Sequence, residues 1–133
     1  MKDARYSKVL LVAALLVVVS HGFSQDKEKD KEGTLVLHGA IEDSQCAYNV
    51  HSDSHSHEWM IKKGVKGASD ERSCTLHCVK ELGGVYVLVV KTDVYRLDDQ
   101  TASERFAGRK VKVTATAGGK PESLHVLKIE EEK

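Results

Sequence analysis

The chain has 133 residues, and its 20 Lys+Arg are balanced by 20 Asp+Glu, a formal net charge of +0 at pH 7. This length is sufficient for one small domain with one hydrophobic core. The neutral balance argues against a nucleic-acid partner, because affinity for phosphates requires a basic surface.

Residues 1–24 predict a signal peptide. Three basic residues within 1–8 precede an unbroken apolar run, Val9 to Val19, and small residues follow at Gly22 and Ser24. The apolar run is shorter than the ~20 residues that cross a bilayer. We therefore expect cleavage before Gln25, export to the periplasm or the extracellular space, and no stable membrane anchor after processing.

The rest of the chain predicts a charged tether followed by a single folded domain. Residues 25–32 alternate acidic and basic side chains without an apolar residue, so they predict a disordered tether. The single β-barrel-like domain is expected over 33–130. Its first strand, 33–41, has apolar residues on one face. Gly39 lies inside this strand, and a glycine at such a position is typical of a bend.

Four further strands are predicted after the middle of the chain, at 85–90, 94–97, 111–117 and 124–129. A short helix, capped by Asp98 or Asp99, separates the third strand from the fourth. The fold class is therefore mainly β with α (α+β). The order matches a small five-stranded, partly open barrel resembling the oligonucleotide/oligosaccharide-binding fold.

The departure from that fold is a long insertion between the first two strands. Residues 45–67 have no clear periodicity and are expected to form a loop. Ser69 is expected to cap the helix that follows, and two glycines, Gly83 and Gly84, to end it. At about 100° per residue, Cys74 and Cys78 are neighbours on one face of this helix.

Several motifs of the chain are shared with one known family. They are Gly39-x-Ile41-x-Asp43-Ser44-x-Cys46, Cys74-x-x-x-Cys78-Val79-Lys80, Gly84-x-Tyr86-Val87-Leu88-Val89, Val94-Tyr95-x-Leu97 and Phe106-Ala107-Gly108-x-x-Val111-x-Val113-Thr114. With these motifs the chain resembles a family of small exported bacterial domains of unknown function. The resemblance implies a small β-barrel or roll and a three-cysteine pattern, and it implies no activity. The chain departs from the family at Ala115-Thr116, where members commonly have a glycine.

The three cysteines, Cys46, Cys74 and Cys78, support two interpretations. In an oxidising compartment a disulfide from Cys46 to Cys74 or Cys78 is favoured, and closing a loop of about 30 residues would stabilise the domain by roughly 3–4 kcal/mol. The odd thiol could then link two chains into a disulfide-bonded dimer. Alternatively, three thiolates, or two with a histidine, supply a soft-metal site for Cu or Zn.

Four histidines are candidate metal ligands beside the cysteines. His51, His55 and His57 lie close together in the long loop, and short histidine-rich tracts can bind metals. Serines are interleaved with them, so a polar solvated loop is the favoured interpretation. His77, between the two helical cysteines, is the fourth candidate, although it points away from the centre of their face.

The sequence gives little support for an enzyme. It contains no phosphate-binding glycine loop and no serine-elbow pattern, and a cysteine nucleophile with His77 lacks a third orienting group. We expect a non-enzymatic, exported small binding domain whose cysteine- and histidine-rich cap is stapled by a disulfide or binds a soft metal. The alternative is a ligand-binding module that uses the barrel groove for a glycan or a peptide.

Overall fold

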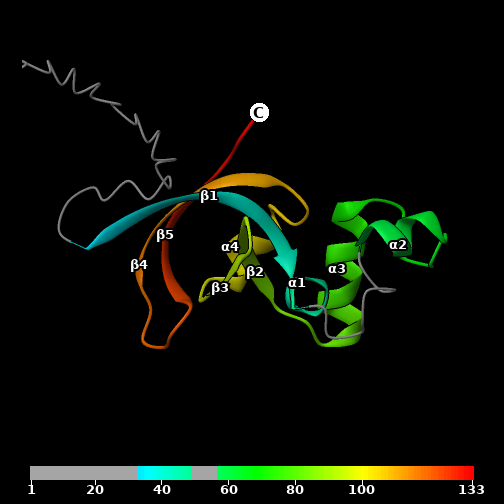
Figure 1. Cartoon of the computed structure of the whole chain (residues 1–133), viewed down its shortest axis with the longest axis horizontal. Coiled ribbons are helices and arrows are strands. Elements are labelled where there is room, and N and C mark those ends of the chain that lie inside the picture. The colour runs from blue at the N-terminus through cyan, green and yellow to red at the C-terminus, as the bar shows by residue number, and fades with distance from the viewer. Residues whose placement is uncertain (1–32, 49–56) are drawn as a thin grey trace, which may run out of the picture.

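The computed structural model describes residues 33–48 and 57–133, which form a closed five-stranded barrel (Figure 1). Its strands are β1 (Thr34–Asp43), β2 (Tyr86–Val90), β3 (Asp93–Leu97), β4 (Lys110–Ala117) and β5 (Ser123–Glu131). They follow the order β1-β2-β3-β5-β4 around the barrel, in which β3 and β5 are parallel and the other neighbours antiparallel. The predicted small α+β barrel is confirmed, whereas its likeness to the oligonucleotide/oligosaccharide-binding fold stays a prediction.

The first strand belongs to two sides of the barrel because it bends. Its first part, from Thr34 to Ala40, pairs with β4, and its last part pairs with β2. Gly39 lies next to the change of partner, where an added Cβ would be only 2.2 Å from the backbone oxygen of Val89. The close approach of the two strands therefore requires glycine.

Two short helices lie in the region where the sequence predicted only a loop. They are α1 (Ser44–Ala47) and α2 (His57–Lys62). The loop prediction is therefore wrong for these residues. Asp43 starts α1 by accepting a hydrogen bond from the backbone N–H of Cys46, as an N-cap does.

The predicted cysteine helix is α3 (Glu71–Leu82). Its cap is Asp70 and not Ser69, because the Asp70 carboxylate accepts from the backbone N–H of Ser73 at 2.7 Å and the Ser73 hydroxyl accepts from the N–H of Asp70 at 2.9 Å. Gly83 ends the helix with φ 74°, as predicted. The short helix between the third and fourth strands is α4 (Gln100–Glu104), with Asp99 as its cap.

The described residues have two apolar clusters. The larger fills the barrel, and its largest fully buried side chains are Leu37, Ile41, Leu88, Leu97, Val111 and Val113. The smaller, which we call the second core, contains Met60, Ala68, Cys74 and Cys78, with Cys46, Trp59 and Val65 packed against them. It is formed where α3 packs against α2 and β1, beside the end of β1 (Figure 1). In the described part of the chain, no helix has the length and apolar character needed to cross a membrane.

Candidate metal centre

The three cysteines come together in the second core. Cys46 comes from α1, and Cys74 and Cys78 come from successive turns of α3, so the three Sγ atoms all lie within 4.8 Å of one another. Cys74 and Cys78 are buried and Cys46 is half-buried. None of the three is bonded to another cysteine, so the structure does not show the predicted disulfide. We call these three residues the cysteine centre.

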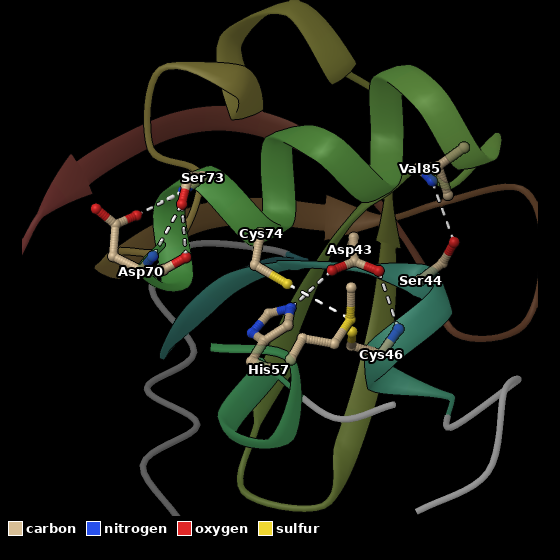
Figure 2. A network of polar contacts seen from close by, with 9 residues as sticks. Asp43, Ser44, Cys46, His57, Asp70, Ser73, Cys74 and Val85 are labelled. Atoms are coloured by element: carbon tan, nitrogen blue, oxygen red, sulfur yellow. Dashed lines mark hydrogen bonds and ion pairs between the residues drawn. The ribbon is translucent and has the colours of Figure 1, made fainter. Parts of the chain in front are cut away.

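Backbone and side-chain hydrogen bonds hold α1 against the end of α3. The Ser44 N–H donates to the carbonyl oxygen of Val85 at 2.9 Å, and the Val85 N–H donates to the Ser44 hydroxyl at 3.1 Å (Figure 2). The Gln45 side-chain amide donates to the carbonyl oxygen of Leu82 at 2.8 Å. These bonds fix Cys46 beside the two cysteines of α3.

Asp43 connects the cysteine centre to His57. The Asp43 carboxylate is fully buried, and its Oδ1 accepts from the Cys46 N–H at 2.9 Å while its Oδ2 accepts from Nε2 of His57 at 2.7 Å. Figure 2 shows the carboxylate between these two partners, with the Cys74 side chain directed toward the same space. Asp43, Cys46 and His57 form a second group of ligand atoms within 4.8 Å of one another.

The Asp43–His57 pair has the electrostatics of a partly buried ion pair. Burial acts to raise the pKa of Asp43, but the hydrogen bonds from His57 and from the Cys46 N–H outweigh it and lower that pKa below 3.8. Burial likewise acts to lower the pKa of His57, but the hydrogen bond to Asp43 and the Asp43 charge outweigh it and raise that pKa above 6.5. Both shifts favour a charged carboxylate facing a protonated imidazole.

The three thiols differ in their tendency to ionise. A hydrogen bond with Cys46 lowers the pKa of Cys78, while the same bond, and then burial, raises the pKa of Cys46. Burial, followed by the charge of Cys78, raises the pKa of Cys74 to about 12. Cys78 is therefore the thiol of the centre that loses its proton most readily.

Met60 adds a fourth sulfur to the second core. The Cys74 thiol donates to Sδ of Met60 at 3.9 Å, and Met60 is 6% exposed. Neither Met60 nor Asp43 was predicted from the sequence as a site residue. Met60 follows His57 by three residues, so the two lie on the same side of α2, and a prediction of that helix would have grouped them.

The structure brings together some of the predicted site residues and not others. Cys46, Cys74 and Cys78 are brought together, and His57 lies next to them through Asp43. His77 belongs to neither group of ligand atoms within the described residues, and its ring packs instead against Gly67, where an added Cβ would be 2.7 Å from Nδ1 of His77. His51 and His55 lie outside the described residues.

Comparison of the chain with protein-family models, with curated proteins and with solved structures returned no match. The family resemblance therefore stays a prediction, and function has to be inferred from the geometry of the cysteine centre and its surroundings.

Proposed function

We propose that the protein is an exported, non-enzymatic binding domain whose cysteine centre binds a soft metal ion, Cu(I) or Zn(II). The observation that supports this most is that the Sγ atoms of Cys46, Cys74 and Cys78 lie within 4.8 Å of one another in the second core, where Cys74 and Cys78 are buried. Thiolate sulfur is the preferred donor for both ions.

The separation of the sulfurs suits a shared ion. Sulfurs that bind one ion at about 2.3 Å each lie about 4 Å apart, so only small side-chain movements are needed. A disulfide requires two sulfurs about 2.05 Å apart and would leave the third cysteine unused. A metal ion uses all three, and it would also link α1 to α3.

The barrel surface offers a weaker alternative. A pocket of about 610 Å³ lies beside the β4–β5 turn, bounded in part by Asp98, Gly118 and His125, and its volume is typical of small-ligand sites. No Phe, Tyr or Trp is among the described residues that line it, so it lacks the aromatic platform on which a glycan ring would stack. Glycan or peptide binding there is therefore the second candidate.

The metal proposal is tested by loading reduced, metal-free protein under anaerobic conditions with Zn(II) or Cu(I) and measuring bound metal after desalting. We expect one ion per chain, and expect it to be lost in Cys46→Ser, Cys74→Ser and Cys78→Ser. His77→Gln is the matched control, because His77 lies outside both ligand groups of the described residues. Folded wild-type protein that retains no ion, or a cysteine variant that retains as much as His77→Gln, would overturn the proposal.

Export is tested separately from binding. The full chain, expressed with its own N-terminus in a bacterial host, is expected in the periplasmic or extracellular fraction, with Gln25 as the first residue found by N-terminal sequencing. An unprocessed chain in the cytoplasmic fraction would contradict export and leave the metal proposal intact.

A further inference from the structure

We infer that Met60 supplies a fourth sulfur ligand to the cysteine centre, so that the site selects Cu(I) over Zn(II). This inference rests on the proposed metal-binding function and deepens it by naming the ion. It is carried by the position of the Met60 thioether and by the hydrogen bonds already made by Asp43 and His57.

The Met60 thioether is placed at ligand distance from the centre. Sδ of Met60 lies 3.9 Å from Sγ of Cys74, and two sulfurs bound tetrahedrally to one ion at about 2.3 Å each are about 3.8 Å apart. Met60 comes from α2, so the four sulfurs come from three helices. The Cys74–Met60 pair therefore already has the spacing of two sulfurs bound to one ion.

The donor type favours Cu(I). Thioether sulfur is soft and uncharged, and it matches a soft monovalent ion. Zinc sites in proteins use cysteine sulfur, histidine nitrogen and carboxylate oxygen. In a centre of three cysteines and one methionine, Met60 is therefore the ligand that favours Cu(I) over Zn(II).

The competing nitrogen and oxygen ligands are already occupied. Both oxygens of Asp43 accept hydrogen bonds, one from Cys46 and one from His57. For His57 to bind zinc through Nε2, it would have to give up its 2.7 Å bond to a fully buried carboxylate. Losing that bond would leave the buried Asp43 charge with the Cys46 N–H but without its cationic partner, which is costly.

Metal binding would itself remove the hydrogen bond that the Met60 sulfur accepts from Cys74. Among the described residues, the one hydrogen bond to the Met60 side chain comes from the weak S–H donor of Cys74. When Cys74 binds a metal ion as thiolate, its proton leaves to solvent, and the ion takes the place of that proton between the two sulfurs. The Met60 lone pair is then directed at the ion.

The test compares Met60→Leu with wild-type protein. Leucine keeps the apolar volume of the side chain and removes the sulfur, and circular dichroism checks the fold. Competition with a chromophoric Cu(I) chelator is expected to show that Met60→Leu binds Cu(I) at least about 10-fold more weakly. Removing a residue that only supports a metal ligand already lowers metal affinity by about that factor, so the loss of a ligand should not be smaller. Competition with a zinc chelator is expected to give the same Zn(II) affinity for both proteins.

Selenomethionine provides a direct readout that does not depend on a substitution. The chain has two methionines, Met1 and Met60, and Met1 lies in the expected signal peptide. X-ray absorption at the selenium edge of labelled, Cu(I)-loaded protein is expected to show copper as a neighbour of selenium at bonding distance. Labelled Met60→Leu, which carries selenium only at Met1, supplies the background.

The outcomes separate the two proposals. If the wild-type protein binds neither ion, the proposed function fails. If it binds Cu(I), but Met60→Leu binds it equally well and selenium has no copper neighbour, the proposed function stands and the role of Met60 is overturned. Preference for Zn(II) over Cu(I) in wild-type protein would also overturn the inference.

Discussion

The Asp43 carboxylate accepts a hydrogen bond at 2.7 Å from Nε2 of His57, a residue 14 positions later in the chain. Asp43 ends β1 and His57 begins α2, so this single contact joins the barrel to the second core. Because Asp43 is fully buried, the strength of this contact depends on the charge of both partners.

Replacing His57 with Gln should change the pH dependence of stability in the metal-free protein. A raised His57 pKa contributes stability that is complete below 6.5 and is lost as pH rises through the folded-state value. A lowered Asp43 pKa contributes stability that is complete above 3.8 and is lost as pH falls through its folded-state value. The destabilisation by His57→Gln should therefore be greatest between pH 3.8 and 6.5, at about 1–3 kcal/mol, and smaller above that range.

Urea unfolding at pH 5 and pH 9 in the presence of a metal chelator measures this difference. His125→Gln is the control, because the ion pair of His125 with Asp98 is exposed and contributes little. An effect of His57→Gln that is the same at both pH values would show that the pair is not an ion pair.

The strands of the barrel could be predicted because their patterns are local. Alternation in the first strand and apolar residues on both faces of 85–90 are properties of each segment alone. Gly39 could be linked to a bend, but its reason, the close approach of Val89, is a tertiary contact. The helix α3 could also be predicted from a local pattern, although its cap was misplaced by one residue. Ser69 and Asp70 are both good caps, and the choice depends on Ser73, which returns the hydrogen bond to Asp70.

The candidate site could be predicted only in part, since its completion depends on tertiary contacts. The spacing of Cys74 and Cys78 placed them on one face, but the approach of Cys46 depends on the hydrogen bonds of Ser44 and Gln45 to later elements. Met60 could not be identified, because α2 has only six residues and too few turns to show a helical period.

Thr75→Val should stabilise the protein. Thr75 is fully buried, and its hydroxyl has no hydrogen-bond partner among the described residues. Valine has a similar shape and helix propensity and removes the unpaired polar atom, so we expect the free energy of unfolding to rise by about 1 kcal/mol. Ser103→Ala is the matched contrast, because the equally buried Ser103 hydroxyl donates to the Asp99 carbonyl oxygen at 2.7 Å and its loss should destabilise. Equal signs for the two substitutions in urea unfolding would refute this account.

Gly39→Ala should destabilise the barrel. The added Cβ would lie 2.2 Å from the carbonyl oxygen of Val89, a backbone atom that can move only if β1 and β2 separate. We expect a loss of about 3 kcal/mol, at the upper end for overpacked sites, measured as a lower midpoint of urea unfolding. Gly119→Ala is the control, since nothing lies within 4 Å of its added Cβ, and a comparable loss there would contradict the steric explanation.

Metal binding to the cysteine centre should release at least two protons at pH 7. The pKa of Cys46 and that of Cys74 are raised, so both carry protons, whereas the pKa of Cys78 is lowered by its hydrogen bond with Cys46. The apparent affinity should therefore rise by at least about 100-fold for each unit of increasing pH, because at least two protons compete with one ion. Chelator competition at pH 6.5 and pH 7.5, corrected for protonation of the chelator, measures this slope.

Met60→Leu should bind Cu(I) more weakly with the same slope, because a thioether carries no proton at these pH values. A slope close to zero in wild-type protein would mean that the ion does not displace the thiol protons and is held outside the cysteine centre.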